Sequence, residues 1–243
     1  MMTTERRVLW VTGAGSGMGR ASAVAAAASG WRVAVSGRRA NAVAETATMI
    51  RDAGGEALEL AVDVTDEDAL GEAHGRLVDT WGDVDGVVLA AGLNTPRRNW
   101  GDQSMTDFAA IVDTNLTSVA RVVDLVLPGM RRSGRGDIVV VSSRSGWRFS
   151  PGAGVAYMSS KTALGALVAS LNDQEGAHGV KACHLCPGDV DTDFLAMRPE
   201  VPGAQQRAQM LTADDIARTV RFVLDSPAHV RIDELAVSPI GQR

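Results

Sequence analysis

The sequence predicts a single α/β domain, in which a doubly wound parallel sheet of seven strands has helices on both faces. Short apolar runs rich in β-branched residues alternate with longer helical segments, which is the order that βαβ units produce. A chain of 243 residues is long enough to bury a large core in one unit. No repeat, low-complexity tract or long linker divides it, so we expect one domain over residues 1–243.

The predicted elements follow one another in strict alternation. The strands are short apolar runs at residues 8–12, 33–36, 57–62, 86–89, 138–142, 181–185 and 234–237. The helices are amphipathic or alanine-rich segments at residues 18–29, 40–53, 67–81, 105–131, 155–177 and 213–224. Helices of a dozen residues or more between such strands favour parallel pairing, because parallel neighbours need a long crossover.

One late segment departs from this compact pattern. Residues 193–209 contain two prolines and a glycine, and the segment is longer than a usual connection between a strand and a helix. It is either a plain surface insertion or a mobile lid over the carboxyl ends of the strands. We favour a substrate lid at about residues 193–210.

Composition excludes several kinds of partner. The net charge is −5 and no Lys/Arg stripe is present, so we expect neither a nucleic acid nor an anionic membrane as partner. No apolar run reaches the ~18 residues that a membrane span needs. The polar start of the chain and the two cysteines, Cys183 and Cys186, indicate a reduced, cytoplasmic protein. These cysteines point to opposite faces of a strand and the four histidines show no ligand spacing, so no metal site is predicted.

A glycine-rich turn joins the first predicted strand to an alanine-rich helix. Glycines allow a tight turn and a close approach to a pyrophosphate, and the helix N-terminus adds free N–H groups and partial positive charge. The position of the turn between strand and helix supports a dinucleotide phosphate site. The candidate residues are Gly13, Gly15, Ser16, Gly17, Met18 and Gly19.

The end of the second strand indicates which dinucleotide binds. An acidic residue there would bind the ribose 2′-hydroxyl of NAD, but the chain has Gly37, Arg38 and Arg39. Gly37 leaves room, and the two arginines can form charge-assisted hydrogen bonds to a 2′-phosphate. The alternative is a solvated arginine pair at the start of a helix. We predict NADP(H), with NAD(H) as the second choice.

Tyr157 and Lys161 are four residues apart and therefore share one face of a helix. A free phenol has a pKa of about 10, and a neighbouring ammonium lowers that value. Tyr157 thus becomes a candidate general acid for a carbonyl oxygen or base for an alcohol. A hydroxyl at the carboxyl end of a strand points into the ligand crevice, which selects Ser143, with Ser142 and Ser145 as alternatives.

In combination these motifs resemble the short-chain dehydrogenase/reductase family. The resemblance rests on Thr12-Gly13-x-x-x-Gly17-x-Gly19, Asn115, Ser143, Tyr157-x-x-x-Lys161 and Pro187-Gly188-x-Val190-x-Thr192, in the family's order over almost the full chain. It implies a Rossmann fold with strand order 3-2-1-4-5-6-7. It also implies hydride transfer in which Tyr157 gives the proton, Ser143 polarises the oxygen and Lys161 lowers the tyrosine pKa and binds the nicotinamide ribose. Asn115 would hold a water that extends the proton relay.

The resemblance assigns further cofactor residues. Asp63 and Val64 would lie at the adenine, and Ala91 and Gly92 would lie beside the cofactor. Many relatives have two asparagines just before the latter pair, where this chain has Leu89 and Ala90. The nicotinamide end would be contacted by Pro187, Gly188, Val190 and Thr192.

The loops expected around the crevice mouth mix aromatic residues with arginines. This mixture indicates a small or medium substrate with a polar or anionic group, read by Arg144 or Arg148; solvated surface arginines are the alternative. The other candidate substrate residues are Asn94, Ser143, Ser145 and Phe194.

The predicted function is an NADP-dependent carbonyl reductase or alcohol dehydrogenase acting on a small molecule. A 3-oxoacyl-thioester (acyl carrier protein) reductase is the second choice, because the chain end lacks the Gly-Gly tail that many such enzymes carry. A non-catalytic dinucleotide sensor is a third. The Ala/Gly/Leu-rich helix over residues 155–177 suits a subunit interface, and the resemblance implies a homodimer or homotetramer.

Overall fold

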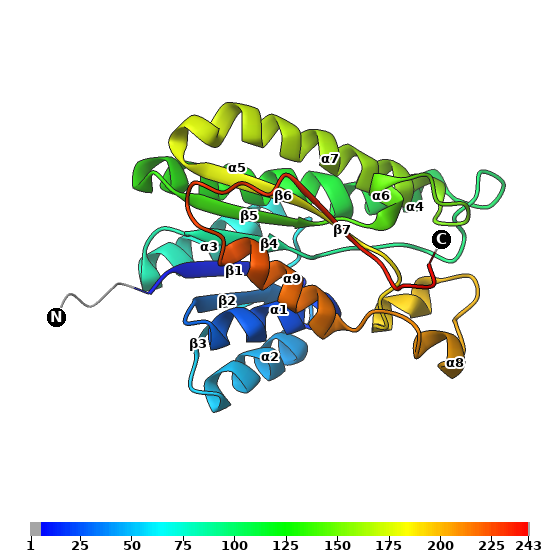
Figure 1. Cartoon of the computed structure of the whole chain (residues 1–243), viewed down its shortest axis with the longest axis horizontal. Helices are drawn as coiled ribbons and strands as arrows, with labels where there is room; N and C mark the ends of the chain where they lie inside the picture. Colours follow the sequence, from blue (N-terminus) through cyan, green and yellow to red (C-terminus); the bar gives the residue numbers. More distant parts are fainter. Residues whose placement is uncertain (1–5, 243) are drawn as a thin grey trace.

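The computed structural model describes residues 6–242, and a seven-stranded parallel sheet forms its centre (Figure 1). The strand order is β3-β2-β1-β4-β5-β6-β7, which confirms the predicted order and fold class. The strands are β1 (Val8–Thr12), β2 (Arg32–Gly37), β3 (Glu56–Ala61), β4 (Gly86–Leu89), β5 (Gly136–Val141), β6 (Val180–Pro187) and β7 (Glu234–Val237).

The helices and helical turns complete the alternation. They are α1 (Gly17–Ala28), α2 (Ala40–Asp52), α3 (Glu67–Trp81), α4 (Met105–Val112), a π-helical turn (Asp113–Thr117), α5 (Ser118–Ser133), α6 (Arg144–Trp147), α7 (Val155–Glu175), α8 (Ala204–Arg207) and α9 (Ala213–Leu224). Short 3₁₀ turns lie at Gly176–His178 and Asp193–Met197. No helix within residues 6–242 is long and apolar enough to cross a membrane.

Two apolar cores cover the two faces of the sheet. Alternate residues along β1 point to opposite faces, so Trp10 packs into one core and Leu9 and Val11 into the other. Helices α3, α5 and α7 close the first core, and α1, α2 and α9 close the second. Figure 1 shows the same division, with α5 and α7 on one side of the sheet and α1, α2 and α9 on the other.

The long predicted helix at residues 105–131 is interrupted, which is the main departure from the expected elements. A π-helical turn replaces the regular pattern between α4 and α5, and Asn115 lies inside it, fully buried. Such turns are rare and frequently mark functional sites. Hydrophobic periodicity does not detect them, because the chain remains helical on both sides.

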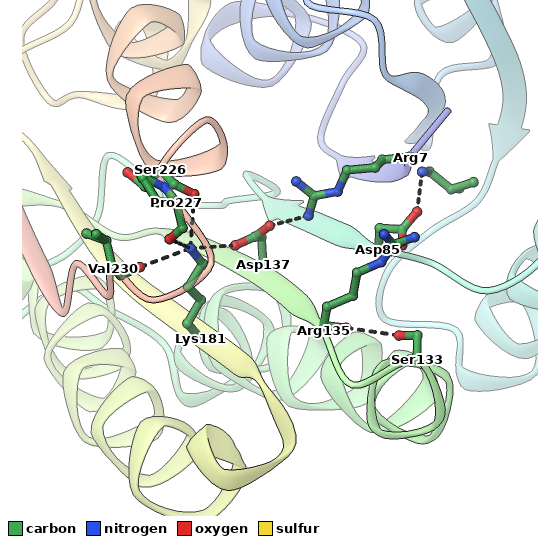
Figure 2. A network of polar contacts seen from close by, with 10 residues as sticks. Arg7, Asp85, Ser133, Arg135, Asp137, Lys181, Ser226, Pro227 and Val230 are labelled. Atoms are coloured by element: carbon green, nitrogen blue, oxygen red, sulfur yellow. Dashed lines mark hydrogen bonds and ion pairs between the residues drawn. The ribbon is translucent and has the colours of Figure 1, made fainter. Parts of the chain in front are cut away.

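The amino ends of the strands are joined by a network of charged groups, drawn in Figure 2. Asp137 is 5% exposed and pairs with both Arg7 and Lys181, the latter at 3.5 Å. Asp85 accepts from the backbone N–H of Val8 at 2.7 Å and pairs with Arg135 at 2.7 Å. This network ties β1, β4, β5 and β6 together at the edge opposite to the carboxyl ends.

Candidate functional site

The turn before α1 presents open backbone donors. Ser16 is the N-cap residue, its side chain makes no capping bond, and the first turn of α1 contains no acidic residue. Other helices are capped by a side chain. The Asp66 carboxylate accepts from the Ala69 N–H at the start of α3, and the Thr212 hydroxyl accepts from the Asp215 N–H at the start of α9. The N-terminus of α1 therefore offers the N–H groups and positive dipole end that a phosphate requires.

Three glycines in this turn are required by its geometry. Gly13 has a φ of +65° and Gly17 a φ of +52°, in the left-handed region that favours glycine. A side chain at Gly19 would collide with the Gly13 carbonyl, so α1 can approach β1 only with glycine there. Gly15 is less restricted, because its nearest neighbour would be the Ala42 side chain at 3.2 Å.

The arginines after β2 lie at the surface beside this turn. The Arg39 guanidinium donates to the Ser16 hydroxyl at 3.3 Å, which brings α2 and the glycine turn together. Arg38 lies 3.9 Å from the Asp63 carboxylate. The space next to Gly37 is open apart from ordinary contacts with Val43 and Gly15. Both arginines are exposed and can reach an anion bound at the end of β2.

Asp63 and Val64 follow β3, as predicted, at the same edge of the sheet. The Asp63 carboxylate accepts from the Thr65 N–H at 3.0 Å and from the Thr65 hydroxyl at 2.8 Å, which fixes the local turn. Val64 is buried. Val64 is thus a core residue, and the Asp63 carboxylate beside it already has local partners.

The segment after β4 is fixed by Asn115. The Asn115 Oδ1 accepts from the Leu93 N–H at 2.7 Å, and Nδ2 donates to the Leu93 carbonyl at 2.9 Å and to the Ser160 hydroxyl at 3.2 Å. The side chain of Asn115 is therefore satisfied by protein groups. It positions the backbone at Ala91 and Gly92, where a side chain on Gly92 would meet only ordinary contacts.

Ser143, Tyr157 and Lys161 are brought together by the packing of α6 against α7. Ser143 caps α6 and accepts from the Ser145 N–H at 3.1 Å, while the alternative Ser142 donates to the Lys161 carbonyl at 3.1 Å. The Lys161 ammonium donates to the Val141 carbonyl at 2.9 Å and lies 5.9 Å from the centre of the Tyr157 ring. Ser143 keeps its hydroxyl on the cavity side, next to Tyr157.

Burial governs the protonation of this group. It raises the pKa of Tyr157 above its ordinary value, while the neighbouring Ser143 hydroxyl and the charges of Arg198 and Arg98 act in the opposite direction. Burial also lowers the pKa of Lys161 to about 8. The cations that favour the Tyr157 phenolate here are thus two arginines from outside the Tyr-x-x-x-Lys pair.

The segment after β6 faces the glycine turn. A side chain at Gly17 would contact Thr192 at 3.3 Å, and Gly188 leaves no room for a side chain because Gln242 occupies the space. Val190 is buried and pairs with Leu211 in an isolated parallel bridge. Pro187 ends β6 at the cavity wall.

One cavity of about 510 Å³ lies at the carboxyl ends of the strands, and it is lined by Ser143 and Tyr157, by Met18 of α1, and by Pro187, Gly188, Val190 and Thr192 from the segment after β6. The predicted substrate residues differ in how they meet it. Asn94, Ser145 and Phe194 line the cavity, with the Phe194 ring 6.0 Å from that of Tyr157. Arg144 also lines it but bonds to the Ser238 hydroxyl at 3.4 Å and the Gln242 carbonyl at 3.3 Å.

Arg148 lies outside the cavity wall. Its guanidinium stacks on the Trp147 ring at 4.2 Å, and both side chains are exposed. The cavity wall instead contains two arginines that sequence reasoning did not select, Arg98 and Arg198. Arg98 lies in one of the loops expected around the crevice mouth, but it sits in no motif, so the sequence did not distinguish it from a solvated surface arginine.

Gly146 is a second residue that the sequence did not single out. A side chain there would collide with the Lys161 carbonyl and the Ser142 hydroxyl, so α6 can lie against α7 only with glycine at this position. The signal was available in Ser143-Arg144-Ser145-Gly146, where a glycine follows the serines, but one glycine in a loop does not show what packs on it.

The two cysteines are unpaired and buried, and burial raises the pKa of each thiol to about 12. Cys183 packs into the core shared with α9, whereas Cys186 lies beside His184, whose Nδ1 is 3.4 Å from the sulfur and 3.1 Å from the Glu234 carboxylate. His184, Cys186 and Glu234 thus form a cluster of three possible metal ligands. Ligand spacing in the sequence could not predict this cluster, because Glu234 comes from the neighbouring strand β7.

A helix N-terminus open to phosphate, a doubly wound sheet, and a tyrosine and a serine in one cavity with a lysine beside the tyrosine define a nucleotide-dependent oxidoreductase of the Rossmann type. The chain matches the short chain dehydrogenase family over residues 7–201 and belongs to that family.

Named relatives match almost the whole chain. Serine 3-dehydrogenase of Agrobacterium fabrum is 31% identical, over 96% of this chain and 93% of that protein. The structure of an alcohol dehydrogenase of the archaeon Thermococcus sibiricus, complexed with 5-hydroxy-NADP, is 31% identical with a TM-score of 0.87, over 98% and 99% of the two chains. A 3-ketoacyl-ACP reductase of Sinorhizobium meliloti 1021 is 31% identical with a TM-score of 0.82, over 95% and 96%.

Proposed function

We propose that this short-chain dehydrogenase interconverts a small carbonyl compound and its alcohol with NADP(H), with Tyr157 as the general acid and base. One observation supports this most strongly. Tyr157 lies beside Ser143 in a cavity that is also lined by Met18 of the glycine turn and by Thr192. NADP(H), when bound, supplies or accepts the hydride.

The chain's own residues would then have distinct roles. The Tyr157 hydroxyl donates a proton to the carbonyl oxygen in reduction and accepts it back in oxidation. The Ser143 hydroxyl donates a hydrogen bond to the same oxygen and stabilises the negative charge that develops there. Lys161 would hold the nicotinamide ribose. Asn115 keeps the backbone at Leu93 in place through two hydrogen bonds.

NADP(H) is proposed over NAD(H) on charge grounds. Arg38 and Arg39 follow β2, and the position at the end of the strand is Gly37 rather than an acid. A 2′-phosphate near these arginines gains two cations, whereas a 2′-hydroxyl finds no carboxylate at the strand end. The archaeal alcohol dehydrogenase complexed with 5-hydroxy-NADP is consistent with this choice.

The test is steady-state oxidation of NADPH and of NADH with a panel of ketones, aldehydes and acyl thioesters, for the native protein and Tyr157→Phe. We expect turnover that prefers NADPH and falls at least about 10³-fold in the variant, with NADPH binding kept. Cofactor binding without turnover of any carbonyl compound would instead support a dinucleotide sensor.

A 3-oxoacyl-thioester reductase is the second candidate, because the Sinorhizobium reductase is as similar in sequence as the alcohol dehydrogenase. The same panel separates the two: a thioester reductase would reduce a 3-oxoacyl pantetheine thioester with a kcat/KM well above that of any simple ketone.

Two further features are proposed for this enzyme. Residues 193–210 act as a substrate lid, since Phe194, Leu195 and Arg198 line the cavity from that segment. The chain forms a homodimer or homotetramer, since small residues such as Ala166 and Ala169 are exposed along α7. Light scattering of the purified protein measures the oligomeric state directly.

A further inference from the structure

Arg98 is a buried cation without a carboxylate partner among residues 6–242. Arg98 is 5% exposed, and all hydrogen bonds of its side chain go to carbonyl oxygens. Nε donates to Thr95 at 2.8 Å, one terminal nitrogen to Gly152 and Ala153 at 3.5 Å each, and the other to Met197. Carbonyl oxygens satisfy the N–H groups but do not neutralise the charge, and an uncompensated buried charge is costly.

The charge of Arg98 is directed at the reacting group. Arg98 lines the cavity together with Tyr157, and its positive charge helps to lower the pKa of that phenol. Arg198 lines the same wall and acts on Tyr157 in the same direction. The two guanidinium groups are close enough that Arg198 also lowers the pKa of Arg98. Two cations therefore lie in the wall of the cavity that contains Tyr157.

The acids in this wall do not cancel both cations. The Asp189 carboxylate pairs with Arg198. Glu200 also lines the cavity but is exposed to solvent, where its charge is screened. Arg144, the third arginine of the wall, is held by the Ser238 hydroxyl and the Gln242 carbonyl. The charge left without a counter-ion is that of the buried Arg98.

We propose that the substrate is a short carbonyl or hydroxy acid whose carboxylate lies against Arg98, with Arg198 as the second cation. This inference rests on the proposed function and names its substrate class. A carboxylate supplies the missing counter-charge without exposing Arg98 to water. The acid must be short, since the cavity of about 510 Å³ also includes Met18, Pro187 and Thr192 at the cofactor side.

The test compares each acid with its own ester. Pyruvate and acetoacetate are paired with their methyl esters, and kcat/KM with NADPH is measured for the native protein, Arg98→Gln and Arg98→Lys. We expect the native protein to prefer the acids and Arg98→Gln to lower the acid-to-ester ratio about 10- to 100-fold. Arg98→Lys keeps the charge and should retain part of the preference.

A purely structural role for Arg98 predicts a different result. Arg98 connects the loop at Thr95 to Gly152 and to Met197, so its loss also loosens the cavity wall. Such loosening would lower kcat/KM for acid and ester alike and leave their ratio unchanged, which would overturn the proposal. Arg97→Gln is the matched control, since Arg97 is the neighbouring arginine and its side chain is 74% exposed.

Arg198 is tested without creating a new unpaired acid. The double variant Arg198→Gln/Asp189→Asn removes the ion pair as a neutral unit, and we expect a smaller fall in the acid-to-ester ratio than for Arg98→Gln. If the native protein reduces simple ketones and the two keto esters but not the two keto acids, the substrate class is overturned and the proposed function stays intact.

Binding separates the two proposals if no turnover is found. Calorimetric titration with butyrate and with butyramide, in the presence of NADP⁺, measures carboxylate recognition without chemistry. Binding of butyrate that weakens at least tenfold in Arg98→Gln would support the anion site even if the protein proved not to be a reductase. Equal affinity for butyrate and butyramide would contradict it.

Discussion

Lys161 titrates in an experimentally convenient range. The chain has only two lysines and one tyrosine, so few groups change charge between pH 8 and 10. Burial lowers the pKa of Lys161 from 10.5 to about 8, so between these values the unfolded chain binds more protons than the folded one. Stability therefore rises with pH from about pH 8.

The buried thiols act in the opposite direction at higher pH. Burial raises the pKa of Cys183 and of Cys186 from 9.0 to about 12, so their contribution is complete below pH 9 and is lost as the pH rises above it. The free energy of unfolding should therefore pass through a maximum near pH 9.

Lys161→Met should remove the rise between pH 8 and 9 and raise the free energy of unfolding at pH 7 by about 2 kcal/mol, because no charge is then buried. Urea unfolding at pH 7, 8, 9 and 10 measures this. Lys181→Met is the control, because that lysine lies in the network at the other edge of the sheet and the rise should persist. A rise that survives in Lys161→Met would show that another group causes it.

The proposed preference for NADP(H) is tested at Arg38 and Arg39. We expect Arg38→Ala/Arg39→Ala to raise the KM for NADPH at least about tenfold and to leave that for NADH within about twofold, because only the former has a 2′-phosphate. Arg51→Ala is the control, since Arg51 is an exposed arginine at the end of the same helix α2. Equal effects on both cofactors would show that the arginines only stabilise the local fold.

Among the elements, the contact of α6 with α7 sets the distance between Ser143 and Tyr157. Gly146→Ala places a methyl group against the Lys161 carbonyl and should push the two helices apart, at a cost of about 1–3 kcal/mol in unfolding free energy. The loss of kcat, expressed as an activation free energy, should exceed the loss of unfolding free energy, because Ser143 moves away from the position of the reacting oxygen. Steady-state kinetics and urea unfolding measure the two effects separately.

Gly75→Ala in α3 is the matched control. Nothing lies within 4 Å of a side chain at that position, so the substitution should stabilise the helix by roughly 0.5–1 kcal/mol and leave kcat unchanged. If Gly146→Ala behaves like Gly75→Ala, the close approach of α6 does not control the site.

The elements also mark the limit of sequence reasoning. The seven strands were predictable to within two residues because continuous apolar runs flanked by turns read as buried strands. The π-helical turn at Asn115 was not, since its cause is a set of bonds from Asn115 to Leu93 and Ser160, which lie on other elements. The burial of Arg98 was not predictable for the same reason, because it follows from contacts with loops that are distant in the sequence.

At the scale of the whole molecule, the carboxyl ends and the amino ends of the strands have different roles. The carboxyl ends carry Ser143 and Pro187 in the cavity wall, whereas Arg7, Asp137 and Lys181 at the amino ends form ion pairs and do not line the cavity. Residues at the carboxyl ends were predictable because ligands in open parallel sheets bind there. The network at the amino ends was not, because Arg7, Asp137 and Lys181 meet only after the strands have paired.

Asp137 tests this division. Asp137→Asn leaves Arg7 and Lys181 facing a neutral amide in a buried setting, which should lower the free energy of unfolding at pH 7 by about 3 kcal/mol. The kcat/KM of the folded enzyme should stay within about twofold, because the change lies at the edge opposite to Tyr157. Glu56→Gln breaks an ion pair with Arg6 in which both side chains are about half exposed, 57% and 49%, and should cost less than about 1 kcal/mol. Equal losses in the two variants would mean that burial adds nothing to the network, and a fall in kcat/KM for Asp137→Asn would show that the amino edge is coupled to the site through the sheet.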